Sequence, residues 1–358
     1  MNFYKLILYV IIFFNTYGYA KSDSYTIIDK NTTLNSKIIY NNSFKINKSN
    51  VVFDCNNSII KNNNSLKIGL LIYSKKKIKN IIVKNCVFVN FNYHGIYIGD
   101  FKRVQLSKNQ NEIYDKSVSD ILLDNINIEK SHKSAIFVGH HVQRVTIKNS
   151  IIKNTGTVGI YLEHSSRYNK IIHNTFSHEV NTKNKREDIA IDSSAHNVIK
   201  NNLFKNNSKG GIFLYKNCGE HIDNKKQVIR WQHSNYNRIE SNLFLNEKVG
   251  IWIASRQSKN LINSNCADIS MDKEKRYYQD FADFNEINNN YFYDVKKPII
   301  NEGDSNYIAN NKANNKHILL QPDTKRNKYL NLPQQLNIYK NNQFNSLKFL
   351  NINKYGKK

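Results

Sequence analysis

Residues Ile147–His164 read IKNSIIKNTGTVGIYLEH, and this stretch holds both halves of a unit that recurs along the chain. The first half, Ile147–Ile152, has an aliphatic residue, an Asn two positions later and another apolar residue three positions after that. The second half, Gly159–His164, alternates apolar with other residues, as a strand with one buried face does. The stretch therefore predicts two short strands joined by turns.

Both halves recur at intervals that define a coil. Copies of the first half begin at residues 83, 123, 147, 171, 199, 239 and 287, so the successive differences are 40, 24, 24, 28, 40 and 48 residues. The base unit is therefore about 24 residues long, and the longer intervals contain insertions. The second half recurs as Gly95–Asp100, Ala135–His140, Gly159–His164, Asp188–Ser193, Gly211–Lys216 and Gly250–Ser255.

Two short strands cannot bury their own apolar faces, but such units stacked coil on coil form one continuous core. The sequence has no long apolar run of helical period, and it lacks the strict hexapeptide repeat of a left-handed β-helix. The prediction is an all-β, single-domain right-handed parallel β-helix (a solenoid) with long loop insertions. The recurrent Asn is expected in left-handed turns and, from coil to coil, in a hydrogen-bonded ladder.

The repeats between about residues 50 and 310 resemble the parallel β-helix repeats of the pectin lyase-like superfamily. This resemblance is specific for the fold. It implies several kinds of chemistry, because that superfamily includes polysaccharide lyases, polygalacturonase-like hydrolases, uronate epimerases and non-catalytic surface proteins.

Residues 1–20 have the features of a signal peptide. Lys5 precedes an apolar run that is too short to cross a bilayer, and small residues precede a cleavage site after Ala20. We therefore expect a periplasmic or secreted protein with no membrane span after cleavage; an uncleaved N-terminal anchor is the alternative. The β-helix is expected over residues 21–310. Residues 311–358 lose the repeat and are expected to form a C-terminal cap or tail.

The charge of the chain favours polyanionic partners. It has 53 Lys and Arg against 28 Asp and Glu, a formal net charge of +25, and loss of Lys5 with the signal peptide leaves +24. For an exported protein an acidic polysaccharide is a more natural partner than nucleic acid. The alternative is that an A- and T-rich genome accounts for the abundance of Lys and Asn.

The four cysteines divide into two pairs. Cys55 and Cys86 occupy similar positions in the repeat, so adjacent coils place them within reach of a disulfide. Cys218 and Cys266 lie in insertions and form a second, less strongly supported pair. An exported protein permits oxidation of both pairs.

In the second strand of each coil, residues that alternate with the buried aliphatic ones point outward. The third position gives a mostly aromatic column that could stack on sugar rings. The alternative is that loops cover these rings as a satellite core. The expected substrate-binding residues are Tyr97, Phe137, Tyr161, Phe213, Tyr215 and Trp252 from the strands, with Arg230 and His233 from an insertion.

Ionisable residues at the strand ends give candidates for catalysis. Glu163 and Asp192 fall in adjacent coils, where they could act as acid and base or hold a cation such as Ca²⁺. The alternative is a salt-bridge cluster. The expected catalytic residues are His140, His164, Lys216, Glu163, Asp192 and Arg256.

Three functions follow from these residues. The first is a lyase or C5-epimerase acting on a uronic-acid polysaccharide, with His140 or His164 as the base and Lys216 and Arg256 neutralising the sugar carboxylate. The second is a glycoside hydrolase that uses Glu163 and Asp192, whose separation would set the stereochemistry. The third is a non-catalytic carbohydrate-binding or adhesive β-helix.

Overall fold

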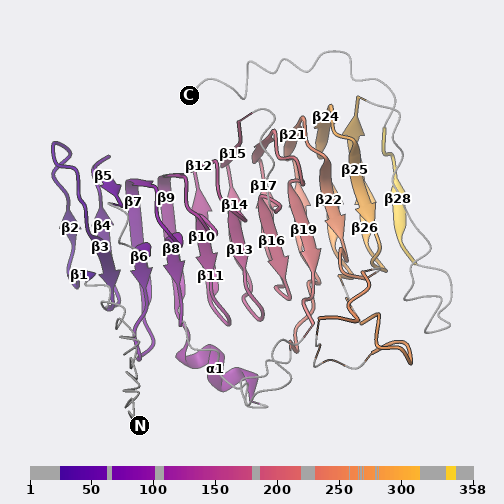
Figure 1. Cartoon of the computed structure of the whole chain (residues 1–358), viewed down its shortest axis with the longest axis horizontal. Coiled ribbons are helices and arrows are strands. Elements are labelled where there is room, and N and C mark those ends of the chain that lie inside the picture. Colours follow the sequence, from indigo (N-terminus) through magenta and orange to yellow (C-terminus); the bar gives the residue numbers. More distant parts are fainter. Residues whose placement is uncertain are drawn as a thin grey trace, which may run out of the picture.

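The computed structural model describes residues 25–62, 67–100, 109–179, 186–218, 230–257, 259–264, 266, 268, 270–278, 280, 282–314 and 336–343. Within these residues the chain winds through successive coils of β-strands that lie side by side from one end of the molecule to the other (Figure 1). Strands of neighbouring coils pair in parallel, as expected for a β-helix.

One long face of the coils is a ten-stranded sheet, which we call the front sheet. Its strands are, in spatial order, β1 (Tyr25–Ile28), β3 (Ser43–Ile46), β6 (Ile68–Ile72), β8 (His94–Ile98), β10 (Ile136–Val138), β13 (Ile160–Leu162), β16 (Ile189–Asp192), β19 (Ile212–Tyr215), β22 (Val249–Ile253) and β25 (Lys297–Asn301).

The remaining strands form the back sheet, which bends into two columns. The first column is β2 (Thr32–Thr33), β4 (Val51–Asp54), β7 (Lys79–Val89), β9 (Ser119–Glu129), β11 (Gln143–Lys148), β14 (Lys170–Ile172), β17 (Val198–Lys200), β20 (Arg238–Glu240), β23 (Glu286–Asn288), β26 (Tyr307–Ala309) and β28 (Ile338–Lys340). The second is β5 (Ile59–Lys61), then β7 and β9 again, β12 (Ile151–Lys153), β15 (Thr175–Ser177), β18 (Leu203–Lys205), β21 (Leu243–Leu245), β24 (Tyr291–Tyr293) and β27 (Lys312–Ala313).

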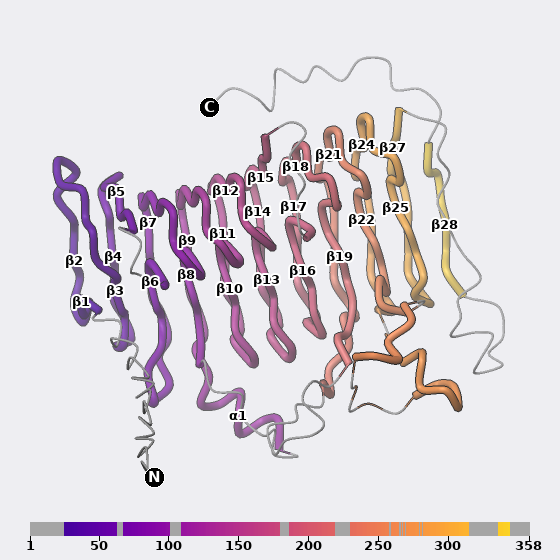
Figure 2. Tube along the Cα trace, viewed as in Figure 1, coloured from indigo at the N-terminus to yellow at the C-terminus, as the bar shows by residue number. Residues whose placement is uncertain are grey.

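The register of the front sheet is the one that the repeat predicts. Each residue of the third-position column pairs with its counterpart in the next coil: Tyr97, Phe137, Tyr161, Ala190, Phe213 and Trp252. The residues on either side point inward and are buried, as with Ile96 and Ile98, which are fully excluded from solvent. Figure 2 shows how regularly the coils follow one another along the molecule.

A column of stacked rings from the back sheet fills the core: Phe176, Phe204, Phe244 and Phe292. Neighbouring ring centroids lie 4.8, 4.7 and 4.9 Å apart. A Cβ atom at Gly250 would lie 2.3 Å from the Phe292 ring, which explains why Gly stands at or just before the start of several front strands. The Phe that ends the first half of the repeat and the Gly that opens the second half are therefore one packing feature.

Buried Asn side chains join the coils at the bend of the back sheet: Asn174, Asn202, Asn242, Asn290, Asn311 and Asn342. The Asn242 side-chain oxygen accepts hydrogen bonds of 3.0 Å from both the backbone N–H and the side-chain amide of Asn202. The Asn242 amide donates in turn to the Ile199 carbonyl and to Asn290. The predicted ladder therefore exists.

The ladder and the left-handed turn use neighbouring residues rather than a single one. The Asn at the third motif position adopts the left-handed conformation, with φ of 52° at Asn149 and 55° at Asn201. The next residue, such as Asn202, forms the ladder. A left-handed residue turns the chain sharply, and the residue that follows it then points inward.

A second ladder of buried Asn side chains runs along another bend of the coils, and the residue before each of four of these Asn residues in the sequence is aromatic. The repeat did not predict this aromatic row. Tyr168, His196, Tyr236 and Phe284 all have a left-handed backbone, with φ between 56° and 59°, and their stacked ring centroids are 5.0, 5.0 and 5.3 Å apart. The sequence signal was an aromatic residue, Asn and any residue immediately before the aliphatic residue that begins four copies of the repeat.

Both cysteine pairs form disulfides. Cys55 and Cys86 join adjacent coils with Cα atoms 4.8 Å apart, as predicted from the repeat. Cys218 and Cys266 join the segments that follow β19 and β22, with Cα atoms 5.2 Å apart. The second bridge ties two insertions together on the side of the molecule where the front strands end.

The repeat continues past the boundary expected at residue 310. β28 pairs in parallel with β26, and Asn342 extends the buried ladder by one coil. Residues 315–335, which are not described, separate this last coil from the others and hid it in the sequence. The expected signal peptide, residues 1–20, and the end of the expected tail lie outside the described residues. Among the residues that are described, no helix is long and apolar enough to cross a bilayer.

The Asn ladder gives a direct test of the fold. We expect Asn242→Ala to lower the free energy of unfolding by about 3 kcal/mol, because two buried donors on Asn202 lose their acceptor. Asn41→Ala, at an exposed position outside the strands, should change it by less than about 0.5 kcal/mol. Urea unfolding measures both variants. Equal losses would contradict a structural role for the ladder.

Candidate functional site

Glu163 and Asp192 lie at the ends of β13 and β16, as the repeat predicts, but a buried arginine lies between them. Arg230 contacts Oε1 of Glu163 and lies 3.2 Å from Oδ2 of Asp192. Arg230 is 6% exposed and Asp192 is fully buried. The insertion after β19 thus supplies a cation that the sequence could not place beside this pair.

The electrostatics of this group favour fixed charges. Burial alone would raise the pKa of Glu163, but the charge of Arg230 and a hydrogen bond from His164 hold that pKa well below its usual range. Burial would lower the pKa of Arg230, but Asp192 and Glu163 raise it well above its usual value. Glu163 therefore stays ionised, and it does not have the raised pKa that a general acid needs.

Asp192 has further partners that occupy its oxygens. The Tyr161 hydroxyl donates to Oδ2 at 2.5 Å, and Asn217 donates to Oδ2 at 2.6 Å and to Oδ1 at 3.0 Å. Because these contacts and Arg230 take up the carboxylate, it lacks the open oxygen ligands that Ca²⁺ requires. The Glu163–Asp192 pair therefore fits neither a calcium site nor the acid–base pair of a hydrolase, and it matches the salt-bridge alternative.

The expectation of exposed aromatic residues on the front sheet is wrong for three of them, two in the third-position column and one, Tyr215, at the fifth position. Tyr97, Tyr161 and Tyr215 are only 7%, 8% and 1% exposed. Tyr97 and Phe137 stack at 4.9 Å and Phe137 and Tyr161 at 5.1 Å, so these rings cover one another. The rings form satellite clusters outside the main core, which was the alternative reading.

Lys216 and Arg256, both expected to neutralise a sugar carboxylate, have surroundings that differ from each other. Lys216 is 9% exposed, and its Nζ lies 3.5 Å from Asp268 within the insertions. Asp280 accepts the backbone N–H groups of both Lys216 and Arg256, at 2.5 and 2.7 Å, and so clamps the ends of β19 and β22 together. Lys216 is therefore paired inside the protein, which argues against it as a neutraliser of substrate.

Arg256 instead lines a cavity of about 370 Å³ over β19 and β22. The residues that surround it are mainly cationic and aromatic: Arg186, Glu187, Lys209, Phe213, Tyr215, Trp252, Ser255, Arg256 and Lys259. Glu187 is the one carboxylate among these residues, and it accepts from Arg186 at 2.6 Å and from the Tyr215 hydroxyl at 3.0 Å. His233 is half-buried and lies outside this lining.

The cationic side chains of this basic cavity lie close enough to repel one another. Burial, followed by the charges of Arg256 and Arg186, lowers the pKa of Lys259. The Arg256 guanidinium lies over the Tyr215 ring, with its central carbon 4.8 Å from the centroid. An anion in this cavity would relieve the repulsion, whereas another cation would increase it.

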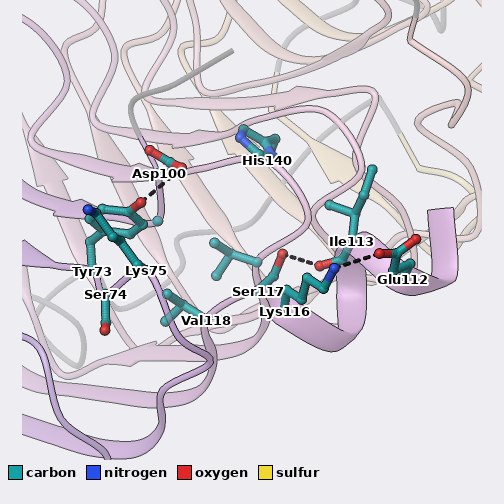
Figure 3. A pocket seen from close by; sticks show the side chains of 12 residues that line it. Tyr73, Ser74, Lys75, Asp100, Glu112, Ile113, Lys116, Ser117, Val118 and His140 are labelled. Carbon is teal, nitrogen blue, oxygen red and sulfur yellow. Dashed lines mark hydrogen bonds and ion pairs between the residues drawn. The ribbon is translucent and has the colours of Figure 1, made fainter. Parts of the chain in front are cut away.

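A second cavity, of about 330 Å³, lies beside the ends of β6, β8 and β10. Helix α1 (Gln110–Lys116) forms one wall, and Figure 3 shows Tyr73 and Asp100 across from it, with His140 between the two sides. Lys75 and Lys116 also line it, and the Tyr73 hydroxyl donates to Asp100 at 3.0 Å. This cavity has mixed charge, in contrast to the basic cavity.

Three histidines meet next to the second cavity. His140 and His164 lie two residues beyond the ends of β10 and β13, at matching positions of the repeat as predicted, and their ring centroids are 5.4 Å apart. His141, one of the polar residues near the insertions, completes the group. Burial, followed by the nearby His140, His164 and Arg167, lowers the pKa of His141 to about 2, so that imidazole is neutral at pH 7.

Comparisons with known proteins agree with the fold. Residues 99–267 match a family model described as a right-handed beta helix region. Among solved structures the chain is similar to the A-module of a mannuronan C-5 epimerase from Azotobacter vinelandii, at 10% identity and a TM-score of 0.50, over 89% of this chain and 85% of that one. The fold is therefore a right-handed parallel β-helix, as predicted from the repeat.

Other similar structures also have names that refer to carbohydrates. An alginate lyase from Paenibacillus sp. shares 12% identity at a TM-score of 0.43, over 92% of this chain and 93% of that one. A lacto-N-biosidase from Eubacterium ramulus shares 10% identity at a TM-score of 0.48, over 90% of this chain but only 44% of that one. This chain thus spans less than half the length of the lacto-N-biosidase. No curated protein matches the chain in sequence.

The buried arginine gives a test of the strand-end cluster. We expect Arg230→Met to lower the free energy of unfolding by about 3–5 kcal/mol at pH 7, because it leaves buried carboxylates without their cation. Arg238→Met, at a site 53% exposed, should cost less than about 1 kcal/mol.

The pH dependence of this loss follows from Glu163. Its pKa is depressed in the folded protein, so the stabilisation is complete above the unfolded pKa and is lost as the pH falls through the folded value. In Arg230→Met this stabilisation is absent, so the difference from wild type should shrink below about pH 4. Urea unfolding at several pH values measures it, and a difference that grows in acid would contradict the assignment.

Proposed function

We propose that the protein is a carbohydrate-active β-helix enzyme that binds an acidic polysaccharide over β19 and β22 and acts on its uronic-acid units as a lyase or C5-epimerase. The observation that carries this proposal is the basic cavity, where Lys209, Arg256 and Lys259 surround a site whose one lining carboxylate is held by Arg186. The overall charge of +25 favours the same class of ligand.

The cavity combines charge with apolar surface in the way a charged sugar requires. Phe213 and Trp252 lie on adjacent coils, half-buried, with centroids 5.4 Å apart. A pyranose ring presents C–H groups that pack on such rings, and its carboxylate would lie against Arg256 or Lys259. Adjacent coils are about 4.8 Å apart, close to the length of one sugar unit. A chain lying across the coils would therefore meet a new strand with each sugar.

The chemistry of a lyase or epimerase needs a base and a neutralised carboxylate. The base removes the C5 proton of a uronate, and the resulting charge is spread into the carboxylate that cations hold. In a lyase the electron pair then forms the C4–C5 double bond as the O4 sugar leaves, and in an epimerase C5 regains a proton from the opposite face. We assign the base to the histidine group, because a polymer that runs across the coils from β22 toward β10 would bring another of its sugars beside His140, in a cavity where Lys75 and Lys116 could hold the carboxylate of that sugar.

The β-helix fold and the chemistry of this site support the enzyme class. The Glu163–Asp192 pair lacks the properties of a hydrolase acid and base, which leaves eliminative or epimerising chemistry as the better fit. A non-catalytic binding protein would use the same cavity without chemistry. Export to the periplasm or medium, which would give access to such polymers, is part of the proposal.

The activity can be tested with a panel of polymers. We expect one or more uronic-acid polysaccharides, and no neutral glucan, to yield products that absorb in the ultraviolet from the C4–C5 double bond or to exchange the C5 proton with deuterated water. New reducing ends without that absorbance would contradict the proposal in favour of hydrolysis. Retained binding without any product or exchange would establish the non-catalytic alternative.

The basic cavity can be tested separately by binding. Arg256→Ala should weaken the binding of a labelled oligouronate about tenfold or more, because a charge-assisted contact is lost. Arg238→Ala removes the same charge from an exposed site on the back sheet and should leave affinity within about twofold. Equal effects of the two changes would mean that net charge, rather than this cavity, determines binding.

A further inference from the structure

The three histidines at the ends of β10 and β13 have the arrangement of metal ligands. One ring nitrogen of each of His140, His141 and His164 lies within 4.8 Å of the other two. Nδ1 of His140 and Nδ1 of His141 are 3.1 Å apart. Tetrahedral zinc with Zn–N distances near 2.0–2.1 Å places ligand nitrogens about 3.3 Å apart. His164 would have to approach by no more than about 1.5 Å to complete this geometry.

Hydrogen bonds behind two of these rings orient them toward one another. Nδ1 of His164 donates to Glu163 Oε1 at 2.9 Å, because an ionised carboxylate only accepts, and this leaves the lone pair on Nε2. Nε2 of His141 contacts Gln110 Oε1 at 2.8 Å, which leaves the lone pair on Nδ1. Such contacts to a carboxylate or carbonyl oxygen fix the tautomer and ring orientation of histidine ligands in metalloproteins.

The surrounding charges are compatible with a cation. Glu163 provides a carboxylate directly behind His164, and Arg230 contacts the same oxygen of that carboxylate. Arg167 is the nearby cation that would oppose an ion, but its guanidinium lies over the Tyr114 ring at 3.6 Å and contacts Gln143. These contacts hold the Arg167 charge on groups other than the three imidazoles.

The cluster also adjoins open space. His140 lines the second cavity, whereas His141 and His164 are buried behind it. An ion held by three imidazoles would therefore have its fourth position toward this cavity, as in sites that keep a water or ligand position open.

We propose that His140, His141 and His164 bind one divalent transition-metal ion of the zinc class, with the fourth position open to the cavity beside α1. Three nitrogen ligands favour zinc, cobalt, nickel or copper over calcium and magnesium, which prefer oxygen. With the ion bound, its water rather than the His140 ring faces the cavity. The metal site does not rest on the proposed function, since neither the basic cavity nor its anionic ligand contributes to it, but it uses the histidines assigned there as the base, and an imidazole that holds the ion cannot also take the C5 proton.

The test uses the full chain without a polyhistidine tag, stripped of metal by a chelator and titrated with Co²⁺. We expect one Co²⁺ per chain, with the visible absorption of a tetrahedral site, displaced by Zn²⁺ and unaffected by excess Ca²⁺. His140→Ala and His164→Ala should each weaken binding at least tenfold, while His132→Ala, at an exposed position on a turn, should have no effect. Circular dichroism confirms that each variant is folded.

A milder variant keeps the inference testable if the buried histidines cannot be replaced. Gln110→Ala leaves all three ligands in place but removes the group behind His141, so affinity should fall about 10- to 100-fold with unchanged stoichiometry. Failure to bind Co²⁺ stoichiometrically would overturn the inference. The inference would also be overturned if none of these substitutions changed the Co²⁺ affinity, or if His132→Ala lowered that affinity as much as the substitutions of the proposed ligands. None of these readouts depends on a polysaccharide, so failure of the metal site would leave the proposed function standing, whereas stoichiometric binding would move the base away from these imidazoles.

Discussion

The parallel register between successive coils is the constraint on which the rest of the structure depends. A coil has no core of its own, so each buried Ile, Phe and Asn must lie directly above its counterpart. The Asn202–Asn242 contacts show how strict this is, because one side-chain oxygen accepts two donors from the coil before it. A shift of one residue would turn the buried column outward and leave those donors without partners. The stacked Phe rings of the back sheet and the glycines of the front sheet that pack on them impose the same alignment.

Because the register is fixed, residues far apart in sequence become neighbours on one face. Glu163 and Asp192 are brought together in this way, and so are Phe213 and Trp252. The insertions add charged side chains next to these positions, which the repeat itself does not supply. Arg230 from one insertion neutralises the carboxylates, and Arg256 and Lys259 from another enclose the basic cavity. The coils thus set the spacing between side chains on this face, and the inserted segments supply the cationic groups around them.

The sequence predicts the scaffold well and the site only in part. The coil, the column from Tyr97 to Trp252 and the Cys55–Cys86 bridge follow from repeat spacing alone, since parallel stacking maps spacing directly onto position. Exposure could not be read in the same way, because it depends on what the insertions cover, and Tyr161 and Tyr215 proved buried. Other features depend on the paths of loops, which have no periodicity. They are the ion pairs of Arg230 and Lys216 and the position of His141 beside the residues that follow two front strands.

The claim that the front sheet recognises a charged sugar over β19 and β22 can be tested at one side chain. The chain has two Trp residues, so Trp231→Phe leaves Trp252 in the basic cavity as the sole indole. Titrating that variant with an oligouronate while recording tryptophan fluorescence should give a saturable change that rising salt weakens and that a neutral oligosaccharide of equal length does not produce. Binding of the oligouronate with no change at Trp252, or an equal change with the neutral oligosaccharide, would contradict the account.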